Sequence, residues 1–206
     1  MAPSTSAQER IHQAALRLFA ERGVTQVNVK ELALAAGVAR GTIYAHVSEP
    51  ERLFEDVAGQ LAAEMNERVA LSFQGVVDPA HRLANGIRFY VRRAHEEPDW
   101  GRFINRFAFA NPAMQQMWNG QPVQDLMNGV LEGRYRFQTA QLPSVVGLVA
   151  GGVLGAILLV LEGHQTWRVA GSDTAELVLI ALGIHPYEAK SLATHELPAL
   201  PDRSAP

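Results

Sequence analysis

Cysteine is absent from the 206 residues, and this absence removes several kinds of chemistry at once. A chain without thiols has no disulfide framework, no thiolate nucleophile and no cysteine-ligated metal site. The histidines also lack the spacing His-x-x-x-His that is typical of metal sites on helices. This is true of His81, His95, His164, His185 and His195. We therefore expect no metal and no cofactor, and the lack of cysteine is consistent with a reducing cytoplasm.

Recognisable catalytic motifs are absent as well. The chain has no glycine-rich phosphate loop, no nucleophile elbow and no histidine–carboxylate set at catalytic spacing. Its first ten residues lack the basic and apolar regions of a secretion signal. Hydrophobic residues make up 48% and charged residues 19%, which is a globular composition. We expect a cytoplasmic protein that is not an enzyme, with an all-helical enzyme as one alternative.

The chain also lacks the strong positive charge of many nucleic-acid-binding proteins. Its net charge is −3. Residues 1–48 carry five basic and three acidic side chains, a local charge of +2. Residues 49–56 add four acidic and one basic side chain, which brings the first 56 residues to −1. Electrostatics alone therefore does not indicate DNA binding.

The first fifty residues nevertheless have the pattern of three short helices. Apolar residues at helical spacing predict a first helix that ends near Arg22. Asn28 is expected to cap a second helix, with Glu31 as its reciprocal partner in a capping box. Gly37 ends that helix, and a third is expected over residues 39–46.

Two short helices joined by a glycine-containing turn form a helix-turn-helix, whose second helix enters the major groove. Ile43 and Val47 are expected to anchor the third helix from one side, which leaves its opposite face for DNA. Arginine donates bidentately to guanine, while threonine and tyrosine hydrogen-bond to phosphates or bases. Glycine allows the backbone to approach closely, and small helical hairpins without DNA binding remain the alternative. The predicted outward residues are Arg40, Gly41, Thr42, Tyr44, Ala45 and His46.

Four spaced motifs follow one another in this part of the chain: IHQAALRLFAERG from Ile11, VKELA from Val29, AGVARGTIY from Ala36 and LF from Leu53. Together they closely resemble the tetracycline-repressor (TetR) family. Their order and spacing agree with the family pattern over about residues 7–66. The resemblance implies an all-helical dimer whose body binds a small molecule. It also implies DNA contacts at Lys30, Arg40, Thr42, Tyr44 and His46.

Two positions depart from the family pattern. Ala39 stands where the family usually has a serine that caps the recognition helix, and a lost cap costs about 1 kcal/mol. Pro50 stands where a lysine often contacts phosphate, and Glu49 and Glu51 flank it. We expect weaker non-specific DNA affinity and a smaller salt dependence than in a typical relative.

The remainder of the chain is predicted to be a helical body. We expect a DNA-binding domain over residues 7–66, a ligand-binding and dimerisation domain over 67–197, and a flexible tail over 198–206. A helix from Pro50 to about Phe73 connects the two domains. Asp78 is expected to cap a further helix that runs to about His95. Its arginines are predicted to form a solvated face: Arg82, Arg88, Arg92 and Arg93.

The densest stretch of aromatic and methionine residues follows this helix. Ligands of helical proteins often bind in apolar pockets that contain a few polar groups. Asn105, Gln115 and Gln116 are candidates for those polar groups, and a plain hydrophobic core is the alternative. The predicted ligand-binding residues are Phe103, Phe107, Met114, Met117 and Trp118.

No charged residue occurs from Phe137 to Leu161, a length that permits a membrane span. Glycines repeat every four residues in this segment, which allows two helices to approach closely. A second apolar helix is expected over residues 174–183, capped by Ser172 or Asp173. We favour a four-helix dimer interface over membrane insertion. The predicted interface residues are Gly147, Gly151, Gly155, Leu158, Leu177 and Ile180.

The sequence therefore predicts an all-α, homodimeric transcription regulator. We expect a repressor that releases double-stranded operator DNA when a small, largely apolar effector binds the C-terminal domain. A membrane-associated or enzymatic all-α protein is the alternative.

Overall fold

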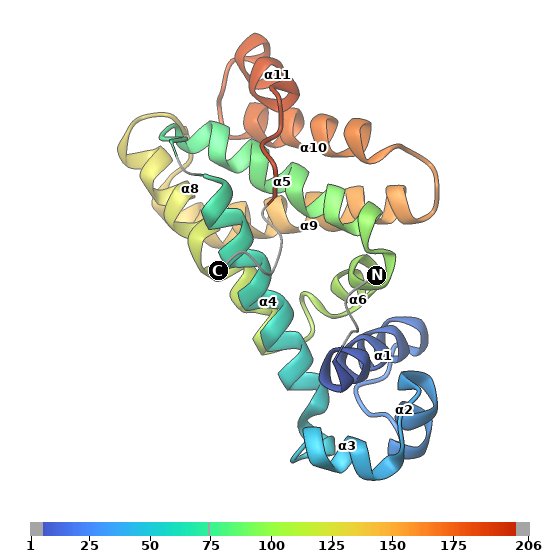
Figure 1. Cartoon of the computed structure of the whole chain (residues 1–206). Coiled ribbons are helices and arrows are strands. Elements are labelled where there is room, and N and C mark those ends of the chain that lie inside the picture. The colour runs from blue at the N-terminus through green and yellow to red at the C-terminus, as the bar shows by residue number, and fades with distance from the viewer. Residues whose placement is uncertain (1–5, 74, 201–206) are drawn as a thin grey trace.

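The computed structural model describes residues 6–73 and 75–200, and every regular element in them is a helix (Figure 1). This confirms the all-α prediction. The helices are α1 (Ala7–Arg22), α2 (Val29–Ala36), α3 (Arg40–His46), α4 (Leu53–Ser72), α5 (Pro79–Glu96), α6 (Pro98–Phe107), α7 (Pro112–Asn119), α8 (Gln121–Leu131), α9 (Leu142–Leu161), α10 (Trp167–Ala181) and α11 (Pro186–Thr194). Single 3₁₀ turns at Pro50–Arg52 and Thr139–Gln141 precede α4 and α9.

The three N-terminal helices begin and end where the sequence predicts. Helix α1 ends at Gly23, whose φ of 68° is the left-handed conformation that glycine adopts at low cost. Asn28 caps α2 by accepting a hydrogen bond from the Lys30 amide at 2.8 Å. The predicted capping box is wrong, because the Glu31 carboxylate instead accepts from Arg22 at 2.7 Å. This ion pair ties the end of α1 to the start of α2.

Helix α4 runs from this N-terminal group to the body (Figure 1). In the body, α5, α9 and α10 pack against one another, and α6 packs against both α5 and α1. Asp78 caps α5 as predicted, since its side chain accepts from the Ala80 amide at 3.2 Å. Helix α6 is therefore the part of the body that lies directly on the N-terminal group.

Helix α10 and the segment after α11 complete the described part of the chain. Helix α10 begins at Trp167 and is capped by Thr166, so the prediction of a cap at Ser172 or Asp173 is wrong. Gly171, Ser172 and Asp173 in this first half are weak helix formers. Packing of Gly171 and the neighbouring Ala170, which are both buried, offsets this low propensity. The predicted tail is described only to residue 200, and Leu197 and Leu200 pack against the core. Residues 201–206 lie outside the described residues.

The arginines of α5 do not form the solvated face that the sequence predicts. Arg88 is 8% exposed and Arg93 only 2%. Arg82 is half-buried and pairs with Asp125 on α8 at 3.0 Å, whereas Arg92 pairs with Glu96 on its own helix at 2.7 Å. The prediction fails because α5 is central in the body and packs against α6, α8, α9, α10 and α11, which cover most of its surface.

The segment Thr139–Leu161 contains a helix that is long and apolar enough to cross a membrane. Here α9 packs against α5, α6 and α10. The side-chain amide of Asn105 on α6 donates to the carbonyl of Leu154 at 3.2 Å, a contact that ties the middle of α9 to the body. Helix α9 is therefore packed into the helical body, where 39% of its most apolar 18-residue window is buried.

Candidate nucleic-acid interface and effector pocket

Helix α3 is held from one side and open on the other. Ile43 is fully buried and Val47 is 6% exposed, so this side anchors the helix against the N-terminal core. Tyr44 is 62% exposed. The remaining outward positions include the exposed Arg40, Gly41 and His46, whereas Thr42 is half-buried. The face that the sequence assigns to DNA is therefore the solvent face of α3.

The polar side chains of this face are available to a partner. Among the described residues, the side chains of Arg40, Tyr44 and His46 have no hydrogen-bond or ion-pair partner. Lys30 is exposed at the start of α2, and its side chain has no hydrogen-bond or ion-pair partner among the described residues. A Cβ at Gly41 would meet no atom within 4 Å, so another backbone can come close there. These groups match the donors that read base edges and phosphates.

Helix α3 lacks the side-chain cap that α1 and α2 have. Ala39 adopts the extended conformation of an N-cap residue, with φ −71° and ψ 151°, but its side chain accepts no hydrogen bond. Helix α3 has only seven residues, so its position depends on packing rather than on intrinsic helix stability. The helix is thus fixed by Ile43 and Val47.

An aromatic cluster joins the N-terminal group to the body. The ring of Phe54 on α4 lies 5.1 Å from Phe19 on α1, 5.4 Å from Phe103 and 4.8 Å from Phe107 on α6, measured between centroids. Several of these pairs are tilted or edge-to-face, the arrangements that aromatic rings prefer. Beside the cluster, Arg106 of α6 lies against Gly23, where a Cβ would collide with its guanidinium. The N-terminal group is therefore docked on α6 rather than tethered loosely.

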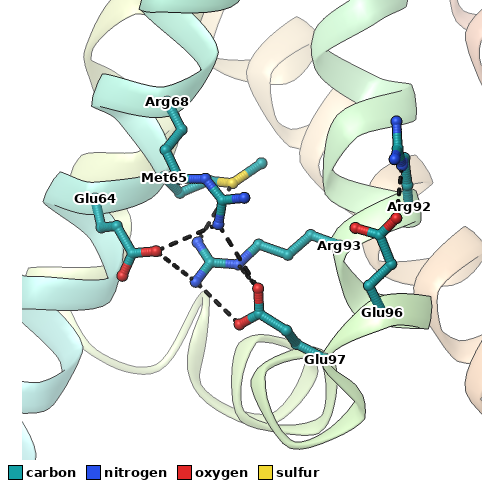
Figure 2. Close-up of polar contacts among 7 residues, drawn as sticks. All are labelled: Glu64, Met65, Arg68, Arg92, Arg93, Glu96 and Glu97. Atoms are coloured by element: carbon teal, nitrogen blue, oxygen red, sulfur yellow. Dashed lines mark hydrogen bonds and ion pairs between the residues drawn. The ribbon is translucent and has the colours of Figure 1, made fainter. Parts of the chain in front are cut away.

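A buried charge network braces the same junction (Figure 2). The guanidinium of Arg93 donates to Glu64 on α4 at 2.9 Å and to both carboxylate oxygens of Glu97 at 3.2 Å. Arg68 on α4 lies 3.4 Å from Glu64 and 3.6 Å from Glu97. The Arg93 guanidinium also stacks over the ring of Trp100 at 4.6 Å. Two arginines and two glutamates thus lock α4 against the end of α5.

The body contains a largely apolar pocket with a volume of about 50 Å³. Helices α4, α5, α7, α8 and α9 all contribute to its walls. Among its lining residues are Val69, Phe73, Tyr90, Trp118, Asp125 and Val149. The Arg82–Asp125 pair closes one side, with the side-chain amide of Gln121 donating to Asp125 at 2.9 Å.

Two buried donors in this pocket lack acceptors. The Oη of Tyr90 and the Nε1 of Trp118 have no hydrogen-bond partner among the described residues. Burial raises the pKa of Tyr90, so its hydroxyl stays protonated and can donate. Buried donors normally have partners. The arrangement suits an apolar molecule that carries a hydrogen-bond acceptor.

Only one of the five predicted ligand-binding residues, Trp118, lines this pocket. Phe103 and Phe107 lie in the aromatic cluster, and Met114 and Met117 are fully buried but do not line it. The predicted polar groups bond elsewhere: Asn105 to Leu154 and Gln115 to the carbonyl of Phe109. The sequence reasoning missed Tyr90 and the Arg82–Asp125 pair. The available signal was Asp125, the one charged residue in the stretch 121–131.

Helices α9 and α10 present an apolar surface to solvent in the single chain. Leu148 and Leu158 are each 50% exposed, and Leu177 on α10 is 66% exposed. A Cβ at Gly147, Gly151 or Gly155 would meet no atom within 4 Å. Ile180 is half-buried beside them. The predicted interface glycines and leucines thus all face outward, so a second helix could approach their backbone closely.

Two families of known proteins match this chain. Residues 11–57 match the family described as bacterial regulatory proteins, tetR family, and residues 78–195 match the tetracyclin repressor-like C-terminal domain. The HTH-type transcriptional repressor AcnR of Corynebacterium diphtheriae is 40% identical over 82% of this chain and 85% of its own length. An uncharacterised HTH-type transcriptional regulator of Mycobacterium tuberculosis is 30% identical, and the match spans 46% of its length.

Solved structures share the whole architecture. RolR, crystallised with its ligand resorcinol, superposes with a TM-score of 0.71 at 25% identity over 95% of this chain and 96% of its own. FadR of Bacillus subtilis, crystallised with stearoyl-CoA, has a TM-score of 0.68 at 18% identity over 85% of this chain and 98% of its own. The latter likeness concerns the fold alone.

Proposed function

Because the chain belongs to the tetR family of bacterial regulatory proteins, we propose that it is a cytoplasmic, homodimeric repressor that releases operator DNA when a small effector binds. One observation carries the DNA-binding part: α3 is anchored by Ile43 and turns Arg40 and Tyr44, which have no partner among the described residues, toward solvent. The DNA contacts proposed are Lys30, Arg40, Gly41, Thr42, Tyr44 and His46.

Dimerisation is proposed through α9 and α10. Pairing two copies would cover Leu158 and Leu177 and would let helices cross closely at the glycines of α9. Burial of exposed leucine side chains gives about 25 cal/mol per Å² of apolar surface. A two-fold axis between the α9–α10 pairs supplies the two reading helices that a palindromic operator requires.

The effector proposed is a flat, largely apolar molecule with at least one hydrogen-bond acceptor. The unpartnered Tyr90 hydroxyl and Trp118 indole N–H would both donate to it. RolR binds resorcinol, an aromatic ring with hydroxyl groups, which is the same combination of features. A cavity of about 150 Å³ holds one benzene ring, so the present 50 Å³ must widen before a ring enters.

This widening is the proposed cause of DNA release. Asn66 and Val69 of α4, with Phe73 directly after the helix, form one wall of the pocket, so a ligand that enlarges the pocket pushes on α4. The same helix carries Phe54 into the aromatic cluster and Glu64 into the charge network. A packed helix transmits such a displacement to the reading helices. The dimer then no longer matches two half-sites about one helical turn apart.

The proposal is tested by selecting genomic fragments with the purified protein and measuring operator affinity with resorcinol and phenol as probes. We expect a saturable loss of operator affinity with at least one of them. In the double variant Tyr90→Phe, Trp118→Phe the response should weaken about tenfold while operator affinity without ligand stays unchanged. If no genomic sequence is selected, the proposal that the chain is a DNA-binding regulator is contradicted. If wild type and the double variant lose operator affinity equally with the probe, only the assignment of the effector to this pocket is contradicted.

A further inference from the structure

A second feature of α5 is a polar stripe on the face opposite the apolar pocket. His81, Asn85, Arg88, Arg92 and His95 follow one another at steps of four, three, four and three residues, which places them on one side of a helix. This side packs against α10 and α11. The stem of Arg88 lies against Gly171, where a Cβ would come 3.5 Å from its Cγ.

The charge of Arg88 is buried without an anion to balance it. The residue is 8% exposed. Its one hydrogen bond among the described residues is a long one of 3.5 Å to the amide oxygen of Asn85. No carboxylate there lies within ion-pair distance of it, and burial lowers its pKa. Removing a charge from water costs far more than one long bond to an amide returns.

A second arginine and two histidines lie near the same place. Arg88 lines a groove of about 560 Å³ between α5, the start of α10 and the end of α11. Arg168 has no carboxylate partner among the described residues, and its guanidinium stacks on Trp167 at 4.4 Å. His195 lies edge-to-face with His81 at 5.1 Å, and the Nε2 of His81 is buried without a hydrogen-bond partner there.

The acidic groups of the groove do not balance these charges. Its carboxylates are Glu96, which already pairs with Arg92, and the exposed Glu196. Arg88 and Arg168 therefore leave an excess of positive charge around a cavity that is also lined by Ser172 and Trp167. A planar guanidinium fork matches the two oxygens of a carboxylate or phosphate group.

The geometry points to a binding site for a small organic anion in this groove. Its carboxylate or phosphate group accepts hydrogen bonds from Arg88, with Arg168 and Ser172 close enough to contribute. Its apolar part lies against Trp167 and Leu197. The site is distinct from the apolar pocket, which uses Leu83, Ile87 and Tyr90 on another face of α5, so it does not depend on the proposed effector.

Calorimetric titration of the full chain tests this inference, with sodium phosphate and sodium benzoate as separate probes and sodium chloride at matched ionic strength as the blank. We expect saturable binding of one anion per chain for at least one probe. If only phosphate binds, the ligand of the groove carries a phosphate group. If only benzoate binds, the ligand carries a carboxylate. Absence of saturable binding with both probes would overturn the site.

Three variants locate the binding. Arg88→Gln and Arg168→Gln should each weaken it, by at least tenfold and threefold respectively. Arg102→Gln removes the same charge from an exposed pair on α6 and should leave it unchanged. Arg168 is exposed, so its variant decides the matter if Arg88→Gln does not fold. Equal affinity in wild type and the folded groove variants would overturn the site.

Discussion

Replacing Arg93 with methionine tests the charge network at the junction of α4 and α5. Methionine retains most of the apolar stem, whereas the charge and the guanidinium that stacks on Trp100 are lost. Removing one partner of a buried ion pair costs about 3–5 kcal/mol. Glu97 has a side chain that is 45% exposed, and Arg68 remains 3.4 Å from Glu64. We therefore expect the lower end of the range, a loss of about 3 kcal/mol in the free energy of unfolding.

Urea denaturation at a fixed protomer concentration is the appropriate assay, because the stability of a dimer depends on concentration. For a chain of this size a loss of about 3 kcal/mol lowers Tm by roughly 6–12 °C. Glu97→Gln leaves Arg93 paired with Glu64 and should cost about 1 kcal/mol. Arg102→Gln, in an exposed pair, should change stability by less than about 1 kcal/mol. If Arg93→Met is as stable as Arg102→Gln, the network does not brace the junction.

Three further results are expected. Ala39→Ser supplies the missing cap of α3 and should raise the free energy of unfolding by about 1 kcal/mol in thermal denaturation; a loss would show that α3 cannot accept a cap. Leu158→Glu places a charge in the proposed interface and should yield monomers in sedimentation velocity; an intact dimer would exclude that interface. Burial alone would raise the Asp78 pKa, but hydrogen bonds from Arg134 and the Ala80 amide, with the charges of Arg134 and His81, hold it below 3.8. The ionised carboxylate therefore stabilises the fold above pH 4 and loses this effect as pH falls through the lowered pKa. Asp78→Asn should be less stable than wild type at pH 7, with a difference that shrinks in acid; a constant difference would contradict this pKa shift.

The N-terminal helices could be predicted because their signals are local. Caps, glycine stops and apolar spacing lie within a few residues of one another, and they placed Asn28, Gly37 and the buried Ile43 correctly. The failed capping box shows the limit of such signals. Glu31 has two possible partners, and Arg22 from a neighbouring helix outcompetes the backbone amide.

The body was harder to predict because burial there depends on which helices surround a residue. The sequence predicts a solvated face for the arginines of α5, yet the side chain of Arg93 donates a hydrogen bond to Glu64, which lies twenty-nine residues away in the sequence. The predicted pocket residues share an apolar character with the core, and sequence cannot tell a core position from a pocket wall. Trp118 is among the residues that the sequence predicts to bind a ligand, whereas Tyr90 becomes a candidate only when its unpartnered hydroxyl is found on a residue that lines the same pocket as Trp118.

Fluorescence anisotropy on a labelled duplex selected from genomic DNA tests most directly whether α3 contacts DNA bases. Arg40→Ala should weaken operator binding by about 1–3 kcal/mol, roughly five- to 150-fold, and relax preference at one base pair per half-site. Arg102→Gln should bind as wild type does. Wild-type protein that binds a scrambled duplex equally well, or Arg40→Ala with undiminished operator affinity, would contradict the account.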